Sequence, residues 1–258
     1  MVLSRFVCLT LLAANFLPAK IIGTPRADFR QSYVLARNGR VAIENLYGNV
    51  SIVAWDREEV LVEATKRASD PERLDEARIV VEPSTDHVFI RTQYIGLHAT
   101  RPASVEYRIT VPRTARLDHI KLVNGGLSIS GVSGLVRASS VNGAIKAEAL
   151  GGEAELSTVN GPLEAAFDRL NRDNRISLTS VNGAIRLSLP AGAGASVNAH
   201  NRSGGIETPF GRPARANDGD RLHAVINRGG AEIQLNNVNG GISIHSTWER
   251  HTKRSCLL

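Results

Sequence analysis

The stretch Ser140–Leu150, SVNGAIKAEAL, contains one of five copies of a Val-Asn-Gly unit in this chain of 258 residues. The asparagines of the five copies are Asn124, Asn142, Asn160, Asn182 and Asn239. The first two steps between these asparagines are 18 residues each. A near-constant period of about 20 residues is typical of solenoids, in which each repeat packs only on its neighbours.

Apolar or small residues alternate with polar ones on both sides of each Asn-Gly. Around Asn142, one series is formed by Val136, Ala138, Ser140, Ile145 and Ala147. A period of two predicts a strand, an Asn-Gly corner and a second strand, with one face buried. Since asparagine tolerates positive φ and glycine adopts it freely, the pair is expected to turn the chain tightly.

The same parity places the corner asparagines in the inward row. Stacked amides can hydrogen-bond from one repeat to the next, so a ladder is expected inside the corner. Its members are Asn124, Asn142, Asn160, Asn182 and Asn239.

If the asparagines face inward, the valines before them face outward. They then form an exposed apolar stripe, and such a patch is a candidate surface for a partner. The stripe consists of Val123, Val141, Val159, Val181 and Val238. The alternatives are that these valines serve only strand propensity, or that N-terminal strands or the C-terminal tail cover them.

The repeats predict an all-β fold, a β-solenoid like a right-handed parallel β-helix with an N-terminal β-sheet layer. Because Asn-Gly is also a hairpin signal, a stacked array of antiparallel hairpins is the alternative. Beyond Asn182, the segments at Ser203 and at Arg228–Gly230 are interpreted as worn corners of the same repeat.

The chain divides into five expected segments. Residues 1–19, with Arg5 and the apolar run Phe6–Ala14, resemble a signal peptide, although a buried first strand or helix would fit too. A leader (20–31), the N-terminal β layer (32–116), the solenoid (117–248) and a tail (249–258) follow. The apolar run is too short to span a membrane, so a secreted, periplasmic or cell-surface protein is expected.

Charge and cysteine content narrow the class of partner. The net charge is +6, but lysines and arginines are scattered singly, which argues against a nucleic-acid partner and leaves weak attraction to anionic envelope polymers. If Cys8 is removed with the signal peptide, Cys256 remains alone. It cannot form an intramolecular disulfide, but it could cross-link two chains.

No arrangement of residues in the sequence indicates catalysis, a metal or another cofactor. The seven histidines lack zinc-ligand spacing. A glycan-cleaving β-helix needs acids that project together, whereas Glu155 and Glu164 are interspersed with arginines and serines. The chain is therefore expected not to be an enzyme, and a polysaccharide-active enzyme is kept as an alternative.

The repeats LVNGGLSIS, SVNGAIKAE and NVNGGISIH, with the opening GNVSIVAWDREEVLVEA, resemble the bacterial putative-adhesin family of β-strand-repeat proteins, a domain of unknown function. This resemblance covers roughly residues 37–245. It implies an exported or envelope-associated solenoid-like domain and brings no catalytic residues.

The expected function is a non-enzymatic exported binding or scaffold module of the cell envelope, adhesin-like, whose partner is an unknown protein or envelope glycan. An envelope-stress regulatory module that binds another protein is a further alternative.

Overall fold

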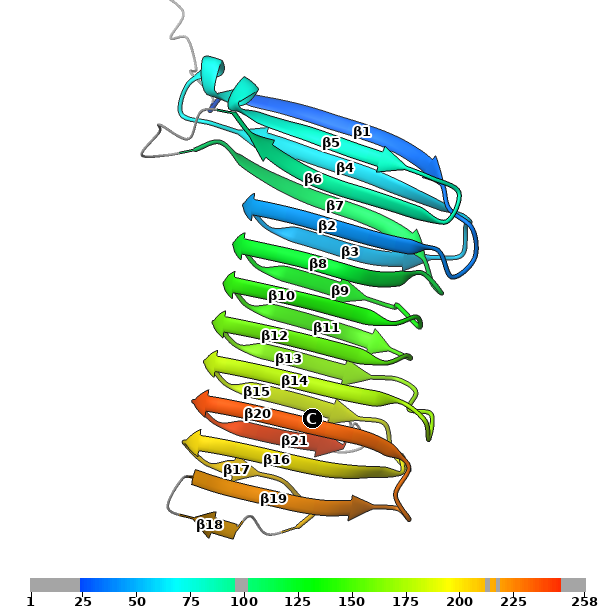
Figure 1. Cartoon of the computed structure of the whole chain (residues 1–258), viewed down its shortest axis with the longest axis vertical. Helices are drawn as coiled ribbons and strands as arrows, with labels where there is room; N and C mark the ends of the chain where they lie inside the picture. Colours follow the sequence, from blue (N-terminus) through cyan, green and yellow to red (C-terminus); the bar gives the residue numbers. More distant parts are fainter. Residues whose placement is uncertain (1–23, 96–101, 212–213, 217–218, 247–258) are drawn as a thin grey trace, which may run out of the picture.

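The computed structural model describes residues 24–95, 102–211, 214–216 and 219–246. These residues form a ten-stranded sheet, called sheet A here, and an eleven-stranded sheet, called sheet B. The two sheets lie face to face along the length of the molecule, with the core between them (Figure 1). The expected signal peptide, the tail and Cys256 lie outside the described residues.

The regular repeats form rungs, each consisting of a strand in sheet B, an Asn-Gly corner and a strand in sheet A. The strand pairs are β8 (Arg116–Asn124) with β9 (Leu127–Ser130), β10 (Val136–Asn142) with β11 (Ile145–Leu150), β12 (Ala154–Asn160) with β13 (Leu163–Phe167), and β14 (Arg175–Asn182) with β15 (Ile185–Leu189). Successive rungs pair in parallel, with Asn142 opposite Asn160. The solenoid prediction is confirmed, and the antiparallel hairpin array is wrong.

The inward rows predicted by the period of two form the core. In sheet A, Ile145, Leu163 and Ile185 stack in register across neighbouring strands and are fully buried. Each such side chain contributes about 1.5–3 kcal/mol through burial of apolar surface. Stability is therefore distributed evenly along the stack.

The rungs continue toward the N-terminus within the same two sheets. β2 (Arg40–Tyr47) and β3 (Val50–Trp55) pair in parallel with β8 and β9, with Tyr47 opposite Asn124. β6 (His87–Tyr94) and β7 (Ser104–Pro112) form the next rung. Within the expected N-terminal β layer over residues 32–116, these strands continue the two sheets of the solenoid by the same parallel pairing.

Antiparallel strands complete this end of both sheets. β1 (Arg26–Val34) pairs with β4 (Glu59–Arg67), which pairs with β7, and β5 (Ala77–Pro83) pairs with β6. A short 3₁₀ helix spans Pro71–Glu76. Residues 26–31 belong to β1, so the expected leader 20–31 is too long; Phe29 packs against the core and draws this segment into sheet A.

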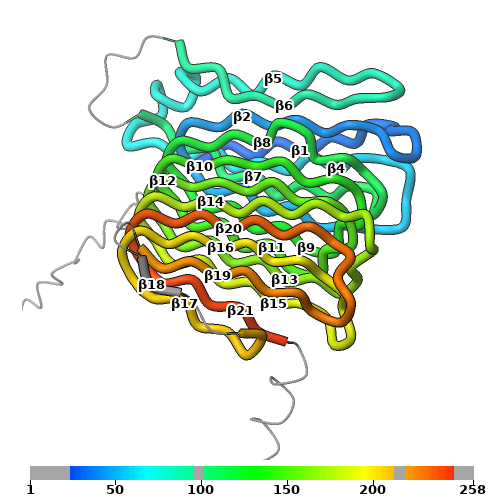
Figure 2. Tube along the Cα trace, turned by 60° about the horizontal axis from the view of Figure 1, so that its bottom comes forward, coloured from blue at the N-terminus to red at the C-terminus, as the bar shows by residue number. Residues whose placement is uncertain are grey.

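The C-terminal strands do not stack in sequence order. They are β16 (Ala195–Ser203), β17 (Ile206–Glu207), β18 (Ala214–Ala216), β19 (Gly219–Ile226), β20 (Ala231–Asn239) and β21 (Ile242–Ser246). The rung of β20 and β21 lies between the rung of β14 and β15 and that of β16 and β17 (Figures 1 and 2).

Two segments, at Ser203 and at Arg228–Gly230, were expected to be degenerate corners of the repeat, and only the first of them is one. Ser203 lies opposite Asn239, at the position of a corner asparagine. Arg228–Gly230 is not a corner of the stack. β19 runs antiparallel to β16 and β20 runs parallel to it, so this segment carries the chain back past β16 instead.

The corner glycines are required by close approach between backbones. A Cβ at Gly143 would lie 2.0 Å from the carbonyl oxygen of Gly125, and one at Gly183 would lie 2.0 Å from that of Gly161. Neither Gly143 nor Gly183 has a left-handed φ, and the corner asparagines are not among the residues with positive φ. The expectation of positive φ is therefore wrong for the asparagines and for Gly143 and Gly183, whereas Gly161 and Gly240 do have positive φ, 150° and 133°.

We predict that Gly143→Ala destabilises the protein by about 3 kcal/mol, because the methyl group overlaps the carbonyl of the neighbouring rung. Urea unfolding followed by circular dichroism measures the change. Gly205→Ala is the matched control, because nothing lies within 4 Å of its Cβ position. Equal midpoints for the two variants would contradict the close-approach explanation.

Candidate interaction surface

The corner asparagines form a continuous ladder of amide hydrogen bonds. Asn142 Nδ2 donates to Asn124 Oδ1 at 2.9 Å, and Asn160 Nδ2 donates to Asn142 Oδ1 at 2.8 Å. Asn182 Nδ2 donates to Asn160 Oδ1 at 2.9 Å, and Asn239 Nδ2 donates to Asn182 Oδ1 at 2.8 Å. The ladder contains the five expected asparagines, and it passes through Asn239 of β20, the strand that lies between β14 and β16.

The ladder lies at the surface, and the expectation that it is buried is wrong. Asn142, Asn160, Asn182 and Asn239 are exposed, and Asn124 is partly exposed. The inward row ends two residues earlier because the chain turns at the corner. The alternation of inward and outward side chains therefore ends before the asparagine, which faces solvent instead of the core.

In the rungs of β10, β12 and β14, the last inward position carries a hydroxyl group that bonds a corner carbonyl. Thr158 Oγ1 donates to Gly143 O at 3.0 Å, and Ser140 Oγ donates to Gly125 O at 3.3 Å. Both side chains are 2% exposed. These hydroxyls satisfy backbone oxygens that the turn leaves without a strand partner. The sequence marks these residues only as small.

At the N-terminal rungs this buried position is occupied by Asn45. Its Nδ2 donates to Val105 O at 2.9 Å, and its Oδ1 accepts from Thr92 Oγ1 at 2.9 Å. Thr92 also bonds the hydroxyl of Tyr107 at 2.8 Å. Burial raises the pKa of Tyr107 to about 12, so the phenol stays protonated across the physiological range.

The valines before the asparagines lie in one row on the outer face of sheet B, beside the ladder. Val141 and Val159 are each 40% exposed, whereas Val123, Val181 and Val238 are partly exposed. The paired strands hold them in register. We call Val123, Val141, Val159, Val181 and Val238 the valine stripe.

Two flanking residues that the sequence did not mark continue this row. Leu46 precedes Tyr47, the register partner of Asn124, and is 37% exposed, so it extends the apolar row by one rung. At the other end, Arg202 precedes Ser203, the register partner of Asn239, and ends the row with a charge. The sequence feature that could have identified Leu46 is the dipeptide Tyr47-Gly48, which takes the place of Asn-Gly in this rung.

Polar columns run beside the valine stripe on the same face. Two residues before the valines, one register row consists of Lys121, Ser139, Ser157, Thr179, Asn236 and His200. In the next column, Arg137 pairs with Asp118 at 3.3 Å and with Glu155 at 3.2 Å. An open trough of about 740 Å³ lies here, with Arg137, Glu155 and Gln234 in its lining.

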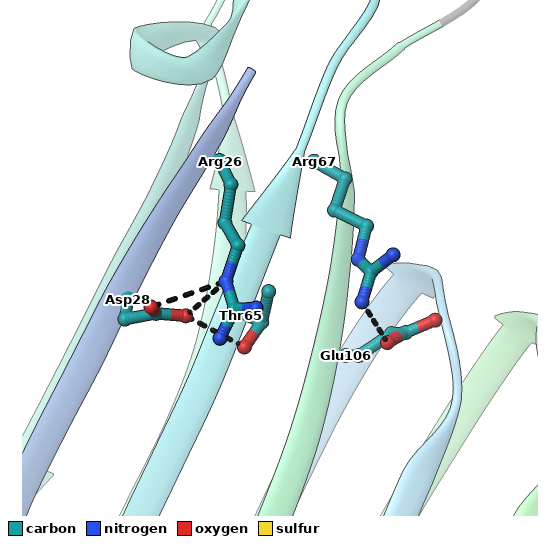
Figure 3. A network of polar contacts seen from close by, with 5 residues as sticks. All are labelled: Arg26, Asp28, Thr65, Arg67 and Glu106. Atoms are coloured by element: carbon teal, nitrogen blue, oxygen red, sulfur yellow. Dashed lines mark hydrogen bonds and ion pairs between the residues drawn. The ribbon is translucent and has the colours of Figure 1, made fainter. Parts of the chain in front are cut away.

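The outer face of sheet A carries a network of charges at its N-terminal end (Figure 3). Arg26 Nε bonds Asp28 Oδ1 at 2.9 Å, and Thr65 Oγ1 donates to the same oxygen at 2.8 Å. These hydrogen bonds hold the pKa of Asp28 below its usual range. Arg67 pairs with Glu106 at 3.8 Å. The network ties β1 to β4 and β4 to β7, which is a structural role.

Two histidines of the described residues contact polar neighbours on the outer face of sheet B. No cluster of three or more His, Cys, Asp or Glu side chains that could hold a metal ion is found in the described part of the chain. His119 Nε2 lies 2.9 Å from Glu44 Oε1, and His223 Nδ1 lies 2.8 Å from Asn198 Oδ1, both on the outer face of sheet B. Among the described residues there is also no helix of the length and apolarity needed to cross a membrane.

A family model described as Toastrack DUF4097 matches residues 104–245 of the chain. Among solved structures, a putative cell adhesion protein from Clostridium sporogenes is similar over 86% of this chain and 100% of its own, with a TM-score of 0.51 and 14% identity. A putative adhesin from Bacteroides fragilis is similar over 85% of this chain and 97% of its own, with a TM-score of 0.29 and 9% identity. A putative lipid binding protein from Parabacteroides distasonis is similar over 85% of this chain and 96% of its own, with a TM-score of 0.33 and 10% identity. No curated protein matches the chain.

We predict that Asn160→Ala destabilises the protein by about 1 kcal/mol, because it removes two solvent-exposed ladder bonds. Urea unfolding measures the loss, with Asn171→Ala, an exposed loop asparagine outside the ladder, as the control. Because Asn160 and Asn182 share one bond, their double alanine variant should lose less than the sum of the single losses. Strict additivity would contradict a connected ladder.

Proposed function

This chain belongs to the Toastrack DUF4097 family, and we propose that it is an exported, non-enzymatic binding module of the cell envelope. The observation that carries the proposal is the valine stripe, a row of partly exposed aliphatic side chains in register on a broad sheet face. Contiguous apolar surface of this kind often marks an interaction site. The solenoid repeats the same contact along its axis, which suits an elongated partner.

The chemistry of the stripe favours a protein partner over a glycan. Aliphatic side chains gain free energy when they are buried against other apolar groups, which a protein surface offers and a hydroxyl-rich glycan largely lacks. The neighbouring column with Ser139, Ser157 and Thr179 adds hydroxyls that can hydrogen-bond at the border of the contact. We therefore assign the stripe to the apolar centre of the interface and the hydroxyl column to its rim.

Adhesion is the form of binding that the proposal favours. The similar structure from Clostridium sporogenes is described as a putative cell adhesion protein. The N-terminal residues Met1–Ala19 support export, because Arg5 precedes a short apolar run that ends before Ala19. A protein recovered from envelope fractions should then begin after residue 19, and intact-mass measurement checks this.

We predict that Val141→Asp with Val159→Asp weakens binding to envelope fractions by at least about tenfold and leaves the fold intact. Two charges placed in the apolar row must lose water when a partner covers them, and that penalty falls on the complex. Co-sedimentation of the purified mature protein with isolated envelopes, before and after protease treatment of the envelopes, measures binding and tests for a protein partner.

The matched control is Val53→Asp with Val225→Asp. These valines are 43% and 59% exposed but lie away from the stripe, Val53 on β3 and Val225 on β19. Equal binding by the two double variants would overturn the proposal. If the stripe variant alone loses its circular dichroism spectrum, the stripe belongs to the core and the proposal is wrong.

A further inference from the structure

The last rung in sequence, β20 with β21, occupies a place between two rungs that precede it. Leu235 of β20 lies opposite Leu178 of β14 on one side and Ala199 of β16 on the other. In sheet A, Ile242 of β21 lies opposite Ile185 of β15 and Ile206 of β17. From β8 onward, no other described rung of paired B and A strands lies between two rungs that precede it in the chain. We call residues 231–246 the inserted rung.

The inserted rung satisfies the backbone on both of its sides. Gly183 N donates to Asn239 O at 2.9 Å, and Ile185 N donates to Gly241 O at 2.9 Å. On the other side, Gly240 N donates to Ser203 O at 3.0 Å. Without this rung, the neighbouring strands would present unpaired edges in both sheets. Unpaired strand edges are templates for strands of another chain.

The connection that leads into the inserted rung is strained. Asn227, Arg228, Gly229 and Gly230 have φ values of 45°, 67°, 70° and 144°. A left-handed conformation is unfavourable for residues other than glycine, and most of all for Arg228, which lacks the short polar side chain of asparagine. The turn is closed by Gly229 N donating to Ile226 O at 3.0 Å. A short connection under strain favours exchange of the element that it leads to.

We propose that two copies of this chain exchange their inserted rungs and form a domain-swapped dimer. Each copy then fills the space between β14–β15 and β16–β17 of the other with its own residues 231–246. The connection 227–230 opens in both chains, and its left-handed turn is released. All pairings of the inserted rung are retained, because its surroundings are identical in the partner copy.

The occupant is a second copy because the space fits this one sequence. Asn239 must donate its amide to Asn182 Oδ1 to continue the ladder. A glycine is needed at position 240, since a Cβ there would lie 2.6 Å from Gly183 O. Ile233, Leu235 and Ile244 must fill the core between the sheets, where each is at most 1% exposed. This inference does not depend on the proposed function.

A disulfide test distinguishes exchange from other association. Asn198 of β16 and Gln234 of β20 are exposed register partners, and neighbouring strands bring Cα atoms to a separation that a disulfide can bridge. One chain carries Asn198→Cys and the other Gln234→Cys, with Cys8 and Cys256 replaced by serine in both. The two full-length chains are unfolded together, refolded over a range of concentrations and oxidised.

The expected result is a covalent heterodimer that increases with protein concentration during refolding. A single chain carrying both substitutions is expected to form the bond within itself at low concentration, which verifies the geometry. The control uses Ser139→Cys and Ser157→Cys in separate chains, because these register partners lie on β10 and β12, outside the exchanged segment. These control chains should remain monomeric on a non-reducing gel.

The connection supplies a second, independent test. Asn227→Gly with Arg228→Gly accommodates the left-handed turn and should lower the dimer fraction by roughly tenfold, measured by size exclusion with light scattering. Arg228→Pro prevents positive φ at that position and should raise the dimer fraction. If the proline variant does not fold, the dimer fraction of the glycine variant alone tests the proposal.

Three results would overturn the proposal. The first is the absence of a cross-link between the Asn198→Cys and Gln234→Cys chains at every concentration, while the doubly substituted single chain closes its bond. The second is equal cross-linking of the Ser139→Cys and Ser157→Cys control chains, which would show unspecific association. The third is a dimer fraction that does not respond to substitution at Asn227 and Arg228.

Discussion

The close contact between the backbones of successive corners is the constraint on which the rest of this structure depends. The carbonyl oxygen of one corner glycine occupies the place where a side chain of the next would begin, as between Gly125 and Gly143. Only glycine permits this approach, and the approach sets the spacing at which Asn142 reaches Asn124. The asparagine and the glycine of the repeat thus have separate tasks. Glycine lets the rungs come together, and asparagine joins them along the outside of the corner.

Register set at the corner is transmitted along each strand to the outer face of sheet B. A shift of one residue would exchange the inward and outward rows, so the ladder and the buried hydroxyls of Ser140 and Thr158 secure the same alignment from two sides. The valine stripe is a consequence of this alignment. A surface that repeats from rung to rung arises wherever the corner repeats. Its length is therefore set by the number of rungs that the chain builds.

The solenoid and the members of the ladder were predictable from the sequence, because both follow from a period that the residues display directly. The exposure of the asparagines was not predictable from the sequence. The alternation of inward and outward side chains holds along a strand, but it ends where the chain turns. The position of β20 between β14 and β16 was also not predictable from the sequence. Asn239 makes the same contact with Asn182 that the asparagine of a directly following rung would make. The Val-Asn-Gly motif is therefore the same whichever rung lies next to it in the stack. His119 has a φ of 78° and lies where the register of β8 with β2 and β10 shifts, as an extra residue in that strand. The repeat pattern in the sequence does not predict this irregularity.

The position of the inserted rung makes the last part of the chain necessary for the middle of the stack. A chain that emerges from its N-terminus first can complete the rungs up to β15 as it appears, but the contacts between β14 and its final neighbour must wait for residues 231–246. A chain that ends early would therefore not be a shorter solenoid with one rung missing from its end. It would be an interrupted one, with exposed strand edges in its interior that a protease or chaperone could recognise. In this fold, the middle of the stack is complete only when residues 231–246 have been added.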